Sequence, residues 1–311
     1  MRIWLMDSGG AGFRAQTAGL GNAIAARHPQ TAITTITVSS RLWPRLFLSA
    51  SLPDKDRPDV VIACGRAAVV PALAAKRRHG AFTVYIQRPP KANAFDAVVC
   101  GLHDNLTGDN VLPIIGSVGG FCANTLVHRR HAAEKIFAAV PEPRTAVLIG
   151  GSNRAFNFTP EDCRQLAAEI KETAGDSGLL VSVSRRTGKQ NTAIFDTAFA
   201  GSKHFFFNGN GDNPYTDMLA VADRFVVTGD SVNMLSEACT AGKPTYIFPL
   251  RKKFICVTAA KFHRFHHLLI DNGYARLWEK RFDEWSSPAF NETARAADFV
   301  LRRYHEWCQR G

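Results

Sequence analysis

The residues best suited to chemistry lie in the stretch TGDSVNMLSEACTAGKPTYIF, residues 228–248. Asp230 or Ser231 would cap a helix that starts here, because short side chains bearing an oxygen are preferred at that position. On a helical period Asp230, Asn233 and Glu237 share one face, and this polar face is left free to meet a ligand. The opposite face is apolar and can pack on a sheet.

The start of this helix is suited to binding phosphate. Its first backbone amides lack partners within the helix and lie at the positive end of the helix dipole. They belong to Ser231, Val232, Asn233 and Met234. Glu237, about two turns further along, could accept hydrogen bonds from both hydroxyls of a ribose. A plain surface helix would tolerate the same pattern, but it would not need the residues 229–231 at its start.

Two glycine-rich turns would bring further amides to a ligand. In DSGGAGFRAQ (7–16), Gly9, Gly10 and Gly12 lie between an apolar run and a helix, where open amides favour anions. The spacing is not G-x-G-x-x-G, so we do not expect a dinucleotide site, and a tight turn explains the glycines equally well.

The second glycine-rich turn is IGGSNRAFNFT (149–159). Gly150 and Gly151 open the backbone, and Ser152 and Asn153 add short hydrogen-bonding side chains. Two such turns, each following the first strand of a series, are more specific than either alone.

Ionisable side chains follow two further strands. In VSRRTG (183–188), Arg185 and Arg186 could grip a diphosphate, because guanidinium groups match phosphate oxygens. His103 and Asp104 follow an apolar strand and could act as a base and the residue that orients it. A solvated loop and a hydrogen-bonded turn are the respective alternatives.

The net charge of +11 and the pI near 9.6 indicate a polyanionic partner. The basic residues are dispersed, and there is no zinc finger, basic tail or aromatic RNA-binding motif, so we expect no nucleic-acid partner. Phosphate-bearing metabolites or an anionic membrane surface explain the charge equally well.

We expect no metal and no cofactor. The histidines of HRRH (128–131) and HRFHH (263–267) lack accompanying cysteines or carboxylates and suit exposed basic helix faces. DKD (54–56) suits a solvated loop. Seven scattered cysteines without a C-x-x-C pair indicate reduced thiols in a cytoplasmic protein.

Apolar runs alternate with helical patterns, which predicts βα units and parallel sheets. The expected strands are 2–6, 32–38, 59–63, 82–86, 97–100, 111–112, 145–149, 179–183, 204–207, 224–227 and 245–248. The expected helices are 14–27, 66–78, 122–139, 160–174, 216–221, 231–241, 258–272 and 291–310. With PEPR (141–144) as a linker, the domains would be 1–140 and 141–290, followed by the helix 291–311.

Several segments resemble a known family. The pattern GGS-x-x-A (150–155), followed by DSVNMLSEACTAGKP (230–244), is similar to the donor-binding half of GT-B glycosyltransferases, including the peptidoglycan N-acetylglucosaminyltransferase group. The chain more closely resembles the mitochondrial-fission Elm-type family. The matching pieces are RPDVVIACGR (57–66), FDAVVCGLHD (95–104), NVLPIIGSVG (110–119), SRRT (184–187) and NPYTDMLAVADRFVVTGDSVNMLSEA (213–238).

The resemblance implies an α/β protein of GT-B architecture, with two Rossmann-like parallel-sheet domains facing a cleft and a C-terminal helix crossing back to the first domain. Glu237 would then hold the donor ribose, and residues 231–234 the diphosphate. Gly9, Gly10, Gly12 and Gln16 would lie on the acceptor side. Related proteins have G-H-x-x-Q at this turn, whereas this chain has Phe13 after Gly12, so a histidine role there is absent.

The function that follows is a metal-independent glycosyltransferase acting on a nucleotide-diphosphate sugar, expected to be UDP-linked. The acceptor would be an envelope or lipid-linked molecule, met at the inner face of an anionic membrane by a peripherally bound protein. A non-catalytic scaffold that binds a partner or a membrane surface, and a nucleotide-sugar epimerase, are the alternatives. The sequence leaves open the base, the sugar, the acceptor, the stereochemistry and the oligomeric state.

Overall fold

The structure is a computed structural model that describes residues 1–38, 52–53, 56–253 and 257–310. Two residues of the DKD stretch, 54 and 55, lie outside the described residues, as does Cys256. Among the described residues, no helix is both long enough and apolar enough to cross a membrane.

The chain forms two compact units, one of residues 1–120 with 291–311 and one of residues 121–290. The sequence suggested a division at residue 140. Helix α3 (Ala123–Ile136) instead packs on α6 (Tyr215–Val221) of the second unit, and its Arg129 pairs with Asp217 at 2.6 Å. These contacts group the segment before residue 140 with the second unit.

The first unit contains a six-stranded parallel sheet in the order β2-β1-β3-β4-β5-β6. Its strands are β1 (Arg2–Asp7), β2 (Ala32–Thr37), β3 (Val60–Cys64), β4 (Phe82–Ile86), β5 (Ala97–Gly101) and β6 (Val111–Ile114). Its helices are α1 (Ala11–Arg27), α2 (Val69–His79) and α9 (Glu292–Arg310), with short 3₁₀ turns at Arg66–Ala68, Ala92–Ala94 and Leu102–Asp104.

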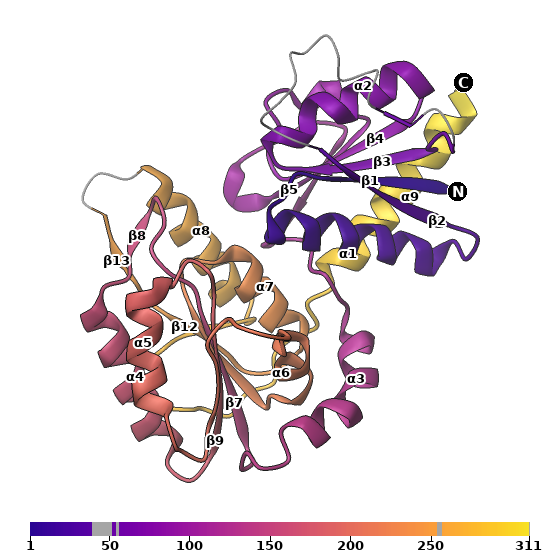
Figure 1. The fold of residues 1–311 in the computed structure, drawn as a ribbon. Coiled ribbons are helices and arrows are strands. Elements are labelled where there is room, and N and C mark those ends of the chain that lie inside the picture. Colours follow the sequence, from indigo (N-terminus) through magenta and orange to yellow (C-terminus); the bar gives the residue numbers. More distant parts are fainter. Residues whose placement is uncertain (39–51, 54–55, 254–256, 311) are drawn as a thin grey trace. The chain divides into compact units, whose positions relative to one another are not determined.

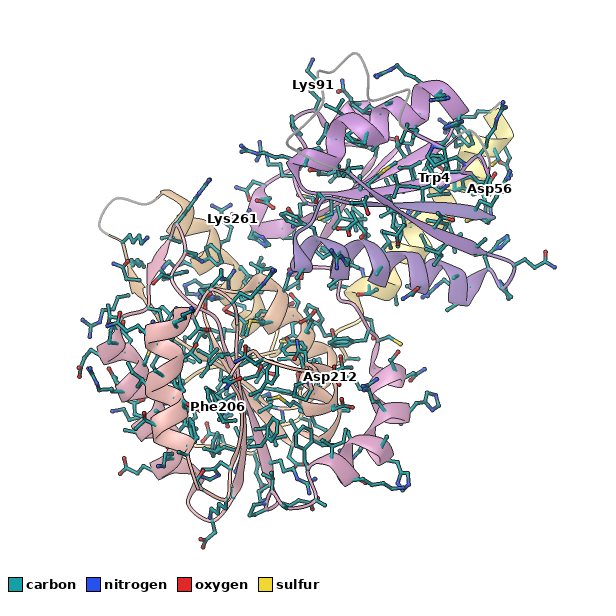
Figure 2. All side chains as sticks on the ribbon, in the orientation of Figure 1. Trp4, Asp56, Lys91, Phe206, Asp212 and Lys261 are labelled. Atoms are coloured by element: carbon teal, nitrogen blue, oxygen red, sulfur yellow. The ribbon has the colours of Figure 1, made fainter. Side chains whose placement is uncertain are left out.

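Helices cover both faces of the first sheet, as expected for apolar parallel strands. Residues of α1 and α9 share one core with the sheet, and residues of α2 share the other with Trp4 (Figures 1 and 2). Helix α9 is tied to this unit at its start, where Glu292 accepts the Ile115 amide at 3.1 Å and Thr293 accepts the Gly119 amide at 3.0 Å. The predicted return of the C-terminal helix to the first domain is confirmed.

The second unit contains another six-stranded parallel sheet, in the order β10-β9-β7-β11-β12-β14, and a small antiparallel pair, β8 with β13. Its strands are β7 (Arg144–Ile149), β8 (Phe156–Asn157), β9 (Gly178–Val183), β10 (Phe205–Phe207), β11 (Arg224–Thr228), β12 (Thr245–Phe248), β13 (Arg251–Lys252) and β14 (Arg276–Leu277). Besides α3 and α6, its helices are α4 (Pro160–Ala174), α5 (Gly188–Phe199), α7 (Val232–Thr240) and α8 (Val257–Asp271).

Local sequence explains most of these elements. Helix α4 begins with a complete capping box between Thr159 and Asp162, with Pro160 at its first position. Helix α5 was not predicted. Its first turn has no side-chain cap, and only the packing of Phe195 and Phe199 into the core identifies its apolar face.

Candidate functional site

Helix α7 begins directly after β11, at the carboxyl end of the second sheet. Ser231, one of the two caps that the sequence allowed, accepts the Met234 amide at 3.3 Å. Val232, Asn233 and Met234 form the first turn and remain partly exposed. The edge of an open α/β sheet where strands end is the usual place for a ligand.

Asp230 precedes the cap and does not belong to an open polar face. Its side chain is fully buried: Oδ2 accepts the Gly151 amide at 3.0 Å and Nη2 of Arg186 at 2.6 Å, while Oδ1 accepts the Thr228 hydroxyl at 2.7 Å. Burial raises the pKa of Asp230, and the Arg186 guanidinium opposes that rise. Asp230 therefore joins the turns that follow three strands, β7, β9 and β11.

The glycines of the β7 turn pack closely on this carboxylate. The Gly150 amide donates to the Thr228 hydroxyl at 2.7 Å. A Cβ on Gly150 would overlap the Asp230 carboxylate, and a Cβ on Gly151 would overlap the backbone of Arg186. Glycine is thus required here by the fold, and both amides bind within the protein rather than projecting toward a ligand.

The two polar residues after these glycines hold the same turn. Ser152 accepts the Phe158 amide at 2.9 Å. Asn153 accepts the amides of Ala155 and Phe156, at 2.7 and 2.9 Å, and donates to the Asp230 carbonyl at 3.1 Å. These hydrogen bonds order the turn and connect it to the residue before the cap of α7.

Of the two arginines after β9, Arg186 forms the ion pair with Asp230. Arg185 is exposed, and among the described residues it makes no hydrogen bond or ion pair. Arg185 is therefore the cation of this pair that is available to a bound anion.

Glu237 lies in the second turn of α7, and only 8% of its surface is exposed. The Tyr215 hydroxyl, at the start of α6, donates to Oε2 of Glu237 at 2.6 Å. No other described residue bonds to this carboxylate. Burial raises the pKa of Glu237 to about 7, which the Tyr215 hydrogen bond partly offsets. The sequence did not indicate Tyr215, which lies 22 positions away.

A second unexpected residue, His266 of α8, supports the turn before α7. Its Nε2 lies 2.8 Å from the Gly229 carbonyl oxygen. Burial lowers the pKa of His266 to about 4, so the ring is neutral near pH 7 and Nε2 carries the hydrogen that is donated. The prediction that HRFHH (263–267) forms an exposed face is therefore wrong for His266. The described residues contain no metal-binding cluster of histidine, cysteine or carboxylate side chains.

In the first unit, the glycine turn after β1 is ordered by local bonds. Gly9, with φ of +85°, donates its amide to Asp7 at 2.9 Å, and Gly10 caps α1. Gly12 lies inside the first turn of α1, because that helix begins three residues earlier than predicted. Gln16 is buried and accepts from Gln87 at 3.5 Å.

His103 and Asp104 form part of the 3₁₀ turn after β5, also at the carboxyl end of a sheet. His103 is only 6% exposed, and its Nε2 lies 3.8 Å from Oδ2 of Asp104. Arg88 donates to the Asp104 carbonyl at 2.7 Å. The structure brings the pair together within a packed, hydrogen-bonded turn.

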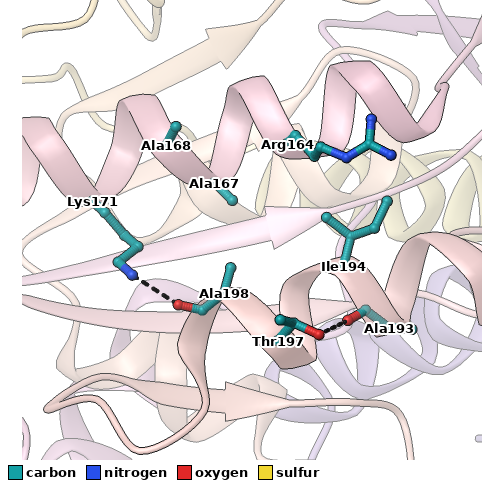
Figure 3. A pocket seen from close by; sticks show the side chains of 8 residues that line it. All are labelled: Arg164, Ala167, Ala168, Lys171, Ala193, Ile194, Thr197 and Ala198. Atoms are coloured by element: carbon teal, nitrogen blue, oxygen red, sulfur yellow. Dashed lines mark hydrogen bonds between the residues drawn. The ribbon is translucent and has the colours of Figure 1, made fainter.

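A separate hollow of about 570 Å³ lies between α4 and α5 (Figure 3). Alanines and Ile194 form most of its lining, with Arg164 and Lys171 on the α4 side. Lys171 donates to the Ala198 carbonyl at 2.9 Å across the hollow. None of its lining residues belongs to the α7 site, by which we mean Arg185, Ser231–Met234 and Glu237.

A family model described as "Mitochondrial fission ELM1" matches residues 11–304 of the chain. The chain belongs to this family. It is 30% identical over 280 residues to the mitochondrial fission protein ELM1 of Arabidopsis thaliana, an alignment that covers 80% of this chain and 64% of the plant protein. The chain thus spans less than two thirds of that relative's length.

Solved structures show the fold. A UDP-GlcNAc 2-epimerase from Neisseria meningitidis, bound to UDP-GlcNAc, matches with a TM-score of 0.55 and 12% identity, over 98% of this chain and 100% of the epimerase. MurG from Acinetobacter baumannii matches with a TM-score of 0.50 and 13% identity, over 98% of this chain and 95% of MurG. The predicted family and the GT-B fold with two Rossmann-like sheets are confirmed. The assignment of individual residues to ligands stays a prediction.

Proposed function

We propose that this ELM1-family protein binds a nucleotide-diphosphate sugar at the start of α7 and transfers the sugar to an acceptor. The observation that carries the proposal is the state of the Glu237 carboxylate. One oxygen accepts a hydrogen bond from Tyr215, and no described residue bonds to the other oxygen. A buried carboxylate so placed, in the second turn after a helix start, suits recognition of ribose hydroxyls beside a diphosphate.

Each part of the donor has a matching group in the second unit. The first turn of α7, beginning at Ser231, supplies the positive end of a helix dipole for the diphosphate. Arg185 supplies an exposed guanidinium that pairs with no carboxylate among the described residues. The turn bearing Gly151 and Asn153 limits how the donor lies against the sheet. This set stabilises a departing diphosphate by fixed dipoles and charge.

In the transfer step, an acceptor hydroxyl oxygen bonds to the anomeric carbon while the bond from that carbon to the diphosphate breaks. The nucleoside diphosphate leaves, and the hydroxyl proton passes to a base. In this proposal the base is the His103–Asp104 pair of the first unit. The acceptor is an envelope or lipid-linked molecule. The Neisseria meningitidis epimerase of similar fold binds UDP-GlcNAc, which supports a UDP-linked donor.

A non-catalytic scaffold is the second candidate. It is favoured by the burial of His103 and by the use of the Gly150 and Gly151 amides within the protein. On this reading the chain binds a protein partner or an anionic membrane surface, and changes at Glu237 leave that binding intact.

The test is thermal stabilisation by UDP, GDP, ADP, CMP and TDP in the presence of EDTA. A ligand that binds only the folded state stabilises it by RT ln(1 + [L]/Kd), so a ligand of ~100 μM affinity is detectable at millimolar dose. We expect one nucleotide to stabilise the wild type but not Glu237→Ala. Glu161→Ala, which removes an exposed carboxylate on α4, is the matched control and should respond like the wild type.

The absence of stabilisation by every nucleotide would refute the donor site and favour the scaffold. If a nucleotide binds, incubation with its sugar derivative separates the remaining possibilities. Release of free nucleoside diphosphate with sugar on an acceptor indicates transfer, whereas an isomerised nucleotide sugar indicates an epimerase.

A further inference from the structure

A hollow of about 500 Å³ lies in the first unit near the amino ends of β4, β5 and β6. His103 and Asp104 follow the opposite, carboxyl end of β5. The lining of the hollow includes Phe82, where β4 begins, and the segments just before β5 and β6. The last turns of α9 form the other wall. Its size falls within the roughly 300–1,000 Å³ typical of small-ligand sites.

Trp307 of α9 provides a flat apolar wall. It meets Phe82 edge to face with ring centroids 5.8 Å apart, and it stacks on Tyr304 at 6.0 Å. The side chain still leaves 38% of its surface exposed. Aromatic side chains with one free face are well suited to pack against a ring with an apolar side.

The polar lining is only partly satisfied by the protein. Arg303 makes two long hydrogen bonds, at 3.4 Å to Glu306 and at 3.5 Å to the Asp96 carbonyl, and its Nε is buried without an acceptor among the described residues. Asp109 and Arg310 make no hydrogen bond or ion pair to any described residue. Both donors and acceptors are therefore available within one hollow.

The charge of the lining excludes a simple anion site. The lining contains the guanidinium groups of Arg303 and Arg310 and the carboxylates of Asp96, Asp109 and Glu306. Arg303 pairs with Glu306 at 3.4 Å. The Asp96 carboxylate accepts hydrogen bonds from Lys76 and Thr83. The remaining lining charges, two arginines and two carboxylates, balance. A ligand that both donates and accepts hydrogen bonds without a net charge fits this lining best.

We propose that this hollow binds a neutral saccharide. The C–H face of a sugar ring would pack on Trp307, and its hydroxyls would accept from Arg303 or Arg310 and donate to Asp109 or Glu306. This site is distinct from the α7 site of the second unit and does not depend on nucleotide binding there.

The test is a titration of the full chain with maltose, cellobiose, lactose and N,N′-diacetylchitobiose, followed by tryptophan fluorescence and saturation-transfer NMR. We expect saturable binding of at least one of them in the millimolar range. Trp307→Ala should weaken it by about tenfold or more, the effect of losing one aromatic stacking contact. Asp109→Asn should weaken it several-fold without affecting folding, because Asp109 has no hydrogen-bond or ion-pair partner among the residues that the structure describes.

Gln309→Ala is the matched control, since this exposed residue lies on the same turn of α9 outside the hollow. It should bind like the wild type, and so should Glu237→Ala. The absence of saturable binding by all four sugars would overturn the proposal. Unchanged binding in both Trp307→Ala and Asp109→Asn, or tighter binding of galacturonate or inorganic phosphate than of any neutral sugar, would overturn it as well.

Discussion

Replacing Glu237 by glutamine should remove a specific pH dependence from the stability of the second unit. Burial raises the pKa of Glu237 from 4.5 to about 7. Between these two values the folded protein holds a proton that the unfolded chain has released. The free energy of unfolding therefore falls as the pH rises from about 4.5 to about 7, and it becomes level above that range.

The size of this effect follows from the difference in pKa. A shift of about 2.5 units corresponds to roughly 3 kcal/mol at 1.36 kcal/mol per unit. Glutamine has nearly the same shape, its carbonyl can still accept from Tyr215, and it does not ionise. Relative to the wild type, Glu237→Gln should thus gain about 3 kcal/mol between acidic and mildly alkaline pH.

The assay is urea unfolding from about pH 5 to about pH 8, followed through the transition of the second unit. The comparison must be between proteins at each pH, because His266 contributes in the opposite sense. Its lowered pKa, about 4, gives stability that is present above its ordinary value of 6.5 and is lost as the pH falls toward 4. Both proteins contain His266, so its contribution cancels in the difference.

Glu161→Gln is the control, because the Glu161 side chain is 70% exposed. Its pH profile should parallel that of the wild type. If the profile of Glu237→Gln also runs parallel to the wild type, Glu237 does not carry a raised pKa, and the argument that it is held buried beside Tyr215 fails.

Two further predictions concern the turns around Asp230. Gly150→Ala should destabilise the second unit by about 2 kcal/mol, because the added methyl group overlaps the Asp230 carboxylate. The control is Gly120→Ala, whose Cβ would meet only ordinary contacts, the nearest at 3.7 Å. Equal melting temperatures for the two variants would show that Gly150 is not closely packed against Asp230. Arg186→Met should cost about 2 kcal/mol in urea unfolding because it leaves a buried carboxylate unpaired, whereas Arg185→Met should change stability by less than about 0.5 kcal/mol. Equal effects of the two arginine variants would show that the pairing with Asp230 is not formed in solution.

Sequence patterns predicted the strands that alternate with helices, because buried parallel strands are continuous apolar runs. VVIAC in β3 and TAVLI in β7 are examples. The sequence patterns did not predict α5 or the two-residue strands β8, β13 and β14. These three strands form only by pairing with strands distant in sequence. The apolar face of α5 is recognisable only when Phe195 and Phe199 are seen against the sheet.

The sequence by itself determined the family, the order of the two series of βα units and the stretch in which a helix follows the strand ending at Thr228. These depend on composition and on spacing within one segment. Tertiary structure decided the roles of the polar residues in that stretch. Helical periodicity placed Asp230 on a polar face open to a ligand. In the fold, the turns after three strands meet, and Asp230 is buried against Gly150 and Arg186.

The same limit applies to Glu237. Its position in the helix was readable, whereas its raised pKa and its hydrogen bond come from burial and from Tyr215 on a different helix. A side chain's partner and its desolvation are set by residues that the fold, and not the sequence order, places beside it.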